Sequence, residues 1–256
     1  MEFFDSHSHY NDEKFENIRE QLIQDTYNAG VTKFVCAGYD ISSSRLALDI
    51  ANNYDFIYTT CGISPNDIDG STEADFEEIY KLASKKNVVA IGEIGLDYHW
   101  NTDNKEKQKE IFIKQIEIAN KLELPIVIHT RDAVADTIDI LKNKIECKCK
   151  GVFHCCPHNI ELIKEGLKLG FYISFAGPIT FKNAKNADLV INEVPLDRML
   201  IETDSPYLSP EPLRGTINDS RNVKYVAEKI AEVKGISIEE VANATYQNAM
   251  TIFKIK

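Results

Sequence analysis

The chain has 256 residues, of which 43% are hydrophobic and 27% are charged, a composition typical of a globular protein with a sizeable core. Its formal net charge of −11 excludes functions that depend on a basic surface alone, such as non-specific binding of nucleic acid through its phosphates. Its apolar runs are all much shorter than the roughly 20 residues that a membrane-spanning helix needs, so we expect no membrane partner.

Apolar runs rich in β-branched residues recur along the chain. Most are nearly continuous rather than alternating, which is typical of parallel strands that are covered on both faces. They predict strands at residues 3–9, 33–38, 56–63, 88–97, 125–130, 151–156, 171–177 and 199–204.

Helical patterns separate these strands. The longest has apolar residues at helical spacing from Ile111 to Leu122, and Gly30 and Gly170 stand where glycines that end helices belong. Two further helices are expected at residues 219–234 and 238–253, after a proline-rich loop. Ser237 and Glu240 have the spacing of a capping box for the second of them.

Alternation of strand and helix about eight times indicates a closed (β/α)₈ barrel, a fold that takes about 250 residues. We therefore predict an α/β protein with one domain spanning residues 1–256. The alternative is an open, doubly wound sheet. That fold commonly has a glycine-rich phosphate loop after its first strand, and no such loop follows residue 9.

Six cysteines occur, and two of them, Cys36 and Cys61, lie in expected buried strands. The N-terminus enters a strand at once, without the basic and apolar segments of a signal peptide. We therefore expect reduced thiols and a cytoplasmic protein. Cys147 and Cys149 have the spacing of a metal pair, but a zinc finger needs a second pair and none is present at that spacing.

The first expected strand ends in Asp5-Ser6-His7-Ser8-His9. Side chains alternate along a strand, so His7 and His9 point to the same face and can share one metal ion. A single His-x-His pair is more often an ordinary surface feature. Its significance here comes from the ends of the later strands, because the active sites of barrel enzymes lie at the C-terminal ends of the strands.

The other strand ends carry the same kinds of residue. Each alone has an ordinary structural explanation, such as a buried ion pair, a satisfied core histidine or a turn cap. Together they form a complete set of metal ligands, and a shared metal centre removes the cost of burying a carboxylate. The predicted ligands are His7, His9, Glu93, His129, His154 and Asp204.

Six ligands exceed what one tetrahedral zinc needs and suit two divalent cations. His7, His9 and Asp204 come from strands that are neighbours in a closed barrel, and we expect them to hold one cation. His129 and His154 would hold the other, with Glu93 as the bridge. Two cations about 3.5–4 Å apart can generate a hydroxide and stabilise the leaving oxygen of a phosphodiester.

Several stretches resemble the TatD family of metal-dependent deoxyribonucleases, and the resemblance covers essentially the whole chain. They are Asp5-Ser6-His7-Ser8-His9, Ala90-Ile91-Gly92-Glu93-Ile94-Gly95-Leu96-Asp97-Tyr98, Pro125-Ile126-Val127-Ile128-His129-Thr130-Arg131-Asp132-Ala133, Phe153-His154-Cys155 and Ile201-Glu202-Thr203-Asp204-Ser205-Pro206-Tyr207-Leu208. The resemblance implies a (β/α)₈ fold, cleavage of DNA with divalent metals, often from the 3′ end, and metal roles for the same six residues.

The chain departs from the family pattern at two positions. Family members commonly have a histidine, placed to contact phosphate, where this chain has Ser64, and an aromatic residue where it has Cys156. Ser64 still offers a neutral hydrogen bond, whereas Cys156 removes a possible stacking face for a base. Arg131 and Arg214 are candidates for binding phosphate, with surface salt bridges as the alternative.

We therefore predict a hydrolase with two divalent cations that cleaves DNA, preferably single strands or ends, with Asp204 deprotonating the attacking water and Glu93 bridging the cations. The His-rich set suits Zn, Mn, Ni or Fe, and Mg is the family's usual ion. The first alternative is hydrolysis of a small ester, amide or lactone, which the charge of −11 and Ser64 favour. The second is a metal-binding barrel that serves as a partner module without turnover.

Overall fold

The computed structural model describes residues 1–100 and 102–256. Eight strands form one sheet in the order β1 to β8, and each strand is parallel to the next. The strands are β1 (Phe3–Ser8), β2 (Val31–Ala37), β3 (Ile57–Cys61), β4 (Val88–Asp97), β5 (Ile126–Arg131), β6 (Gly151–Phe153), β7 (Tyr172–Phe175) and β8 (Met199–Ile201).

The last strand returns to the first. The backbone N–H of Asp204, just after β8, donates to the carbonyl of His7 at 2.9 Å, and the N–H of His9 donates to the carbonyl of Ser205 at 2.7 Å. These two bonds join the C-terminal ends of β8 and β1. The sheet is thus a nearly closed (β/α)₈ barrel, which confirms the predicted fold.

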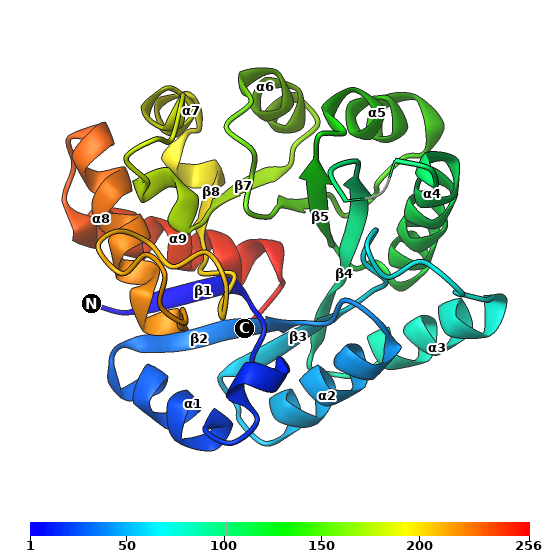
Figure 1. The fold of residues 1–256 in the computed structure, drawn as a ribbon, viewed down its shortest axis with the longest axis horizontal. Helices are drawn as coiled ribbons and strands as arrows, with labels where there is room; N and C mark the ends of the chain where they lie inside the picture. Colours follow the sequence, from blue (N-terminus) through cyan, green and yellow to red (C-terminus); the bar gives the residue numbers. More distant parts are fainter. Residues whose placement is uncertain (101) are drawn as a thin grey trace.

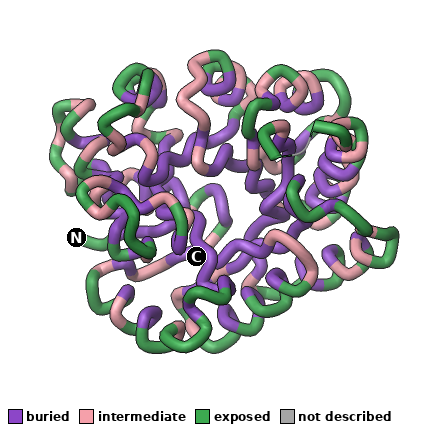
Figure 2. The backbone as a smooth tube through the Cα atoms, viewed as in Figure 1, coloured by how far each residue is buried: buried purple, intermediate pink, exposed green. Residues whose placement is uncertain are grey.

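Helices surround the barrel on its outside, and the buried backbone lies mainly in the strands and on the inner faces of the helices (Figures 1 and 2). The helices are α1 (Arg19–Asn28), α2 (Ile41–Asn52), α3 (Glu73–Ala83), α4 (Lys105–Leu122), α5 (Val134–Asp139), α6 (Ile160–Lys168), α7 (Ala187–Glu193), α8 (Val223–Lys234) and α9 (Ile238–Ile252). Short 3-10 or π-helical segments are η1 (Glu13–Phe15), η2 (Ile140–Lys144), η3 (Gly177–Thr180), η4 (Leu196–Arg198) and η5 (Ser220–Asn222).

The helix ends follow the sequence signals. Ser237 and Glu240 form the predicted capping box at the start of α9, which satisfies backbone N–H groups that have no partner inside the helix. Gly30 and Gly170 follow α1 and α6 with φ of 95° and 86°, a conformation that other residues rarely adopt.

Six strands end earlier than the sequence predicts, and two of them do so by three residues. β6 ends at Phe153 rather than residue 156, and β8 ends at Ile201 rather than residue 204. Cys155 and Asp204 have φ of 36° and 56°, in a region that a regular strand does not use. The chain therefore leaves the sheet just before the predicted site residues His154 and Asp204.

An apolar cluster fills the N-terminal end of the barrel. Phe4 of β1 packs against Phe253, which follows α9, with ring centroids 6.2 Å apart. The side chain of Asn248 in α9 donates to the carbonyl of Met199 at the start of β8, at 2.9 Å. Helix α9 thus covers this end, and the polar residues of the barrel gather at the other.

Two further findings concern membrane-spanning helices and the cysteines. No helix in the described parts, residues 1–100 and 102–256, is long and apolar enough to cross a lipid bilayer. The six cysteines are free thiols, in agreement with the expectation from the sequence.

Candidate metal centre

The pairing of β1 with β2 shifts register between Asp5 and Ser8. Ser6 already faces the barrel interior, where its Oγ lies 3.1 Å from Oγ of Ser174 on β7. The shift lets the next residue, His7, face the interior as well, a re-aiming that is typical of bulges beside active sites. Both histidines of the predicted pair therefore point into the mouth of the barrel.

The first group of candidate ligands joins the ends of β1 and β8. Nε2 of His7 lies 3.2 Å from Nε2 of His9. Oδ1 of Asp204 lies 3.2 Å from Nε2 of His9 and 3.7 Å from Nε2 of His7. One ligand atom from each residue thus lies close enough to the other two to share a cation.

The second group is centred on Glu93 of β4. Its Oε1 lies 3.0 Å from Nδ1 of His129 and 3.4 Å from Nε2 of His154, while its Oε2 lies 3.6 Å from Nε2 of His7. The two oxygens of this carboxylate therefore face different histidines. This is the placement expected of a residue that bridges two cations.

Two of the four rings have a hydrogen-bond partner on the nitrogen that faces away from the cluster. Nδ1 of His9 lies 3.1 Å from the carbonyl of Ala37, and Nε2 of His129 lies 2.9 Å from Asp97 Oδ2. Nδ1 of His154 makes no hydrogen bond but faces Glu202 Oε1 at 3.4 Å. A nitrogen that faces such an acceptor carries the hydrogen of a neutral ring.

The inward nitrogen of each neutral ring then presents a lone pair. For His9 it faces the Asp204 carboxylate, and for His129 it faces Glu93 at 3.0 Å. A lone pair in contact with a carboxylate oxygen is repulsive unless a positive charge lies there. Divalent cations satisfy nitrogen and oxygen donors together, so the donor set fits the metal that the sequence predicts.

The electrostatics of the cluster also favour bound cations. Burial raises the pKa of Glu93, but His154, His129 and His7 outweigh it and hold that pKa well below the usual value. Burial lowers the pKa of His129, but its bonds to Asp97 and Glu93 outweigh burial and raise it. The cluster therefore favours ionised carboxylates together with positive charge, which protons supply when cations do not.

A cavity of about 1000 Å³ opens above the cluster. His9, His129, His154, Glu93 and Asp204 contribute to its lining. Of the residues predicted to bind substrate, Ser64 and Arg131 also line it. Arg214 does not, and its guanidinium lies 3.8 Å from the ring centroid of Phe181. The structure thus brings two of the three predicted substrate residues to the candidate metal ligands.

Comparison with known proteins agrees with this geometry. The model of the family described as TatD related DNase matches residues 4–254. This chain belongs to the TatD family. It is 44% identical over 252 residues to an uncharacterized metal-dependent hydrolase, YabD, of Bacillus subtilis, and the match covers 98% of this chain and 99% of YabD.

Other TatD-type proteins are similar over their whole length. YcfH of Escherichia coli K12, another uncharacterized metal-dependent hydrolase, is 38% identical over 258 residues, covering 100% of this chain and 97% of YcfH. The crystal structure of YJJV, a TatD homolog from E. coli K12, superposes with a TM-score of 0.94 at 26% identity and covers 99% of this chain and 98% of YJJV. This protein is thus a TatD-family member related to metal-dependent hydrolases.

Ser64, the first departure from the TatD pattern, is buried at the cavity wall. Its Oγ accepts the backbone N–H of Asn66 at 3.2 Å, and its carbonyl accepts the backbone N–H of Asp67 at 2.9 Å. Burial raises the pKa of Asp67, and the nearby Ser64 hydroxyl partly offsets that rise. Position 64 therefore presents a neutral hydroxyl, and Asp67 adds a carboxylate to the same cavity lining. Cys156, the second departure, also lines the cavity.

The sequence reasoning missed two supporting carboxylates. Asp97 bonds His129, and Glu202 faces His154 and accepts the N–H of Cys155 at 2.6 Å. Such partners orient a ligand ring and fix its hydrogen. The sequence did contain a signal for both carboxylates. Asp97 is four residues after Glu93 and Glu202 is two residues before Asp204, and residues at these spacings lie on the same face of a strand.

Close approach of β4 to β5 also depends on Gly95. Its φ is 142°, and a Cβ at this position would collide with the carbonyl oxygen of His129. The glycine thus allows the strand that carries Glu93 and Asp97 to lie against the backbone of His129.

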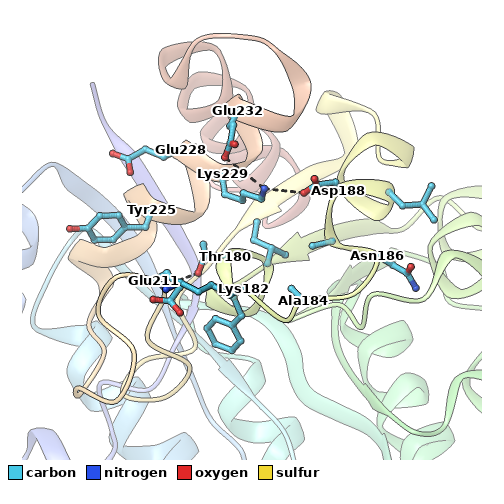
Figure 3. Close-up of a pocket in the computed structure, with 14 residues that line it drawn as sticks. Thr180, Lys182, Ala184, Asn186, Asp188, Glu211, Tyr225, Glu228, Lys229 and Glu232 are labelled. Atoms are coloured by element: carbon cyan, nitrogen blue, oxygen red, sulfur yellow. Dashed lines mark hydrogen bonds and ion pairs between the residues drawn. The ribbon is translucent and has the colours of Figure 1, made fainter.

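A second cavity, of about 580 Å³, lies outside the barrel mouth, between the segment after β7 and helix α8 (Figure 3). Its described lining includes Asp188, Glu211, Glu228, Glu232 and two lysines, but no histidine. Lys229 pairs with Asp188 at 2.9 Å and with Glu232 at 3.7 Å. Lys229 thus pairs with two of the four carboxylates, and both candidate groups of metal ligands found in the described residues lie at the barrel mouth, which remains the candidate site.

Proposed function

We propose that this protein is a divalent-metal-dependent deoxyribonuclease that hydrolyses the phosphodiester bonds of single-stranded DNA or DNA ends, in the manner of a 3′–5′ exonuclease. The observation that carries the proposal is the pair of imidazole–carboxylate groups joined by Glu93 at the floor of the cavity. Two adjacent cation sites suit the displacement of one oxygen by another at phosphorus.

His7, His9 and Asp204 would hold one cation, and His129 and His154 the other, with Glu93 shared. Bound there, divalent cations would supply Lewis-acid stabilisation of the charge that develops on the phosphate and its leaving oxygen. The six side chains fix the positions of both sites before substrate arrives, because strands β1, β4, β5 and the ends of β6 and β8 carry them.

Asp204 would take the proton of the attacking water on its carboxylate. Burial raises the pKa of Asp204, but the bond and charge of His9 outweigh burial and lower it, so the group is ionised at neutral pH and ready to accept a proton. Arg131, at the cavity wall, would orient the substrate through a charge-assisted bond to a phosphate. Asp97 and Glu202 would keep the ligand rings in place.

End-labelled oligonucleotides test this function. Wild-type protein supplied with Mg²⁺, Mn²⁺, Zn²⁺, Ni²⁺ or Fe²⁺ in turn should shorten a 5′-labelled single strand to a ladder of products, faster than it degrades a blunt duplex. His129→Ala should lose this activity under the same conditions, which excludes a contaminating nuclease. Intact DNA with every cation would reject the proposal.

Hydrolysis of a small ester, amide or lactone is the second candidate. The observation in its favour is that Ser64 and Asp67 line the cavity together, so that a carboxylate lies where a cation would aid phosphate binding. A panel of small esters, amides and lactones, assayed with the same metals and the same His129→Ala control, discriminates the two. Turnover of one such substrate without cleavage of DNA would favour this candidate.

A further inference from the structure

We propose that Trp100 is a stacking platform for a nucleobase of a single-stranded substrate, with Arg131 beside it to receive the adjoining phosphate. This subsite rests on the proposed function, because it assumes that the substrate of the metal centre is a nucleic acid. The proposal adds that the nucleoside binds at the wall of the cavity that carries Trp100, and that base stacking as well as charge holds it there.

Trp100 lies in the loop after β4 and contributes to the lining of the cavity. Its exposed fraction is 71%, so the indole ring does not pack into the core and most of its surface is open to a ligand. Burial of so large an apolar ring would contribute substantially to stability. Its exposure beside a site, rather than on a remote surface, is the feature that favours a binding role.

The guanidinium of Arg131 lies 5.3 Å from the centroid of the Trp100 ring. Arg131 ends β5, two residues after His129, and also lines the cavity. A cation with several donors thus lies over one face of a flat apolar ring at one wall of the cavity, and most of the ring surface stays exposed. This combination matches the two chemical parts of a nucleotide, a base with a π-face and an anionic phosphate.

The loop that carries Trp100 is tied to the metal centre. The backbone N–H groups of His99 and Trp100 approach Oδ1 of Asp97 at 2.8 Å and 3.3 Å, while Oδ2 of the same carboxylate holds Nε2 of His129. One side chain therefore positions both the platform and a candidate ligand, so a base on Trp100 would be held in register with the scissile phosphate.

Stacking also explains how an acidic protein can hold a polyanion. Among the described residues that line the cavity, Arg131 is the only lysine or arginine, and the chain has a net charge of −11. Base–aromatic stacking needs no positive field and tolerates any base. It would therefore supply affinity for single strands, whose bases are accessible, and little for a duplex, whose bases are already stacked.

The position within the barrel is consistent with this use. Trp100 follows β4 and Arg131 ends β5. His7, His9 and Asp204 lie at the ends of β1 and β8, across the barrel in the strand order. A nucleotide on Trp100 would thus reach from the β4–β5 wall toward the metal centre and place its phosphate between the two ligand groups.

Trp100 is the only tryptophan of the chain, so tryptophan fluorescence reports on this position alone. The probe is a thymidine tetranucleotide with phosphorothioate linkages, which resist cleavage, titrated into the metal-loaded protein. We expect saturable quenching. A tetramer of the same backbone with abasic sites should give little quenching and weaker binding. Equal responses to both probes, or no quenching by either, would overturn the proposal.

Steady-state kinetics on a single-stranded oligonucleotide provide the second readout. Trp100→Ala should raise KM about tenfold with little change in kcat, because a stacked base contributes equally before and during the reaction; Trp100→Phe should restore part of the loss. The matched control is Tyr80→Ala, which removes a ring that is 42% exposed but lies on α3, outside the cavity. An unchanged KM in Trp100→Ala would contradict the subsite.

The role of Arg131 has its own control. Arg198 lies over the ring of Tyr172 at 5.2 Å, next to the start of β8 at the opposite end of the barrel. Arg131→Ala should raise KM for DNA, and Arg198→Ala should not.

The cleavage assay and the fluorescence titration test different proposals. Cleavage without quenching would reject the Trp100 subsite but not the nuclease activity, whereas quenching without cleavage would reject the nuclease activity but not the subsite.

Discussion

Oδ2 of Asp97 lies 2.9 Å from Nε2 of His129, on the side of the ring that faces away from Glu93. This carboxylate sets the hydrogen on Nε2 and leaves Nδ1 free to bind a cation. Asp97→Asn should therefore weaken metal binding by about 10- to 100-fold, a range typical for loss of such a partner. Competition with a metal-sensitive chelator measures the affinity.

A matched control for this variant is Asp139→Asn, which removes the same charge from a half-exposed position at the end of α5. We expect its metal affinity to equal that of the wild type. If both variants lose affinity equally, overall charge rather than the contact with His129 is responsible.

Glu93→Gln tests the bridging role. A neutral amide cannot neutralise two cations as a carboxylate does, so we expect loss of most hydrolytic activity and weaker binding of at least one cation. The fold should survive, because Glu93 lies at the mouth of the barrel and far from the cluster around Phe4 and α9. Wild-type turnover with unchanged metal content would show that Glu93 is not the bridge.

Metal binding should weaken as the pH falls, because imidazole must be neutral to bind a cation. Burial lowers the pKa values of His9 and His129, but the carboxylates of Asp204 and of Asp97 and Glu93 outweigh it and raise them in the metal-free protein. Protons therefore compete from a pH above the usual imidazole pKa of about 6.5.

Affinity measured between about pH 8 and pH 5.5 should thus decline throughout this range, with activity following it and returning when more metal is added. Circular dichroism at each pH separates metal loss from unfolding. Equal metal affinity and equal activity at the two ends would mean that histidine ligation does not limit the enzyme.

Ser64→His restores the residue type that the TatD family commonly has at this position. The imidazole would lie near Asp67, which lines the same cavity, and the neighbouring carboxylate would favour its charged form. A charge-assisted bond to phosphate is about twice as strong as a neutral one. We expect kcat/KM on DNA to rise about tenfold, mainly through KM, in steady-state kinetics.

Metal content should not change in this variant, since Ser64 is not among the ligands. If the protein is tuned to a small neutral substrate, Ser64→His should instead reduce turnover of that substrate and improve DNA cleavage little. An unchanged kcat/KM on DNA would mean that no phosphate binds near position 64.

The barrel itself was predictable because its signal is repeated. Eight apolar runs with helical patterns between them leave few folds, and residues 88–97 match β4 to the residue. The ends of β6 and β8 were not predictable, since the positive φ of Cys155 and Asp204 comes from the turns that aim the site residues. The pattern of apolar residues gives no signal for such turns.

The six candidate ligands could be found from strand ends because parallel strands meet at one edge of the barrel. Asp97 and Glu202 could have been found from their spacing to Glu93 and Asp204. The place of Arg214 on Phe181 and the exposure of Trp100 could not, because loop side chains are placed by contacts distant in sequence. The three-dimensional structure is needed to show that Trp100 lines the cavity and that Arg214 does not.

Elemental analysis of the purified protein tests the central claim most directly, namely that His7, His9, Glu93, His129, His154 and Asp204 hold two divalent cations. After loading with Mn²⁺ or Zn²⁺ and removal of excess metal, the wild type should contain two ions per chain, and His9→Ala and His154→Ala should each lose one. Wild-type metal content in both variants, with unchanged folding by circular dichroism, would contradict the account.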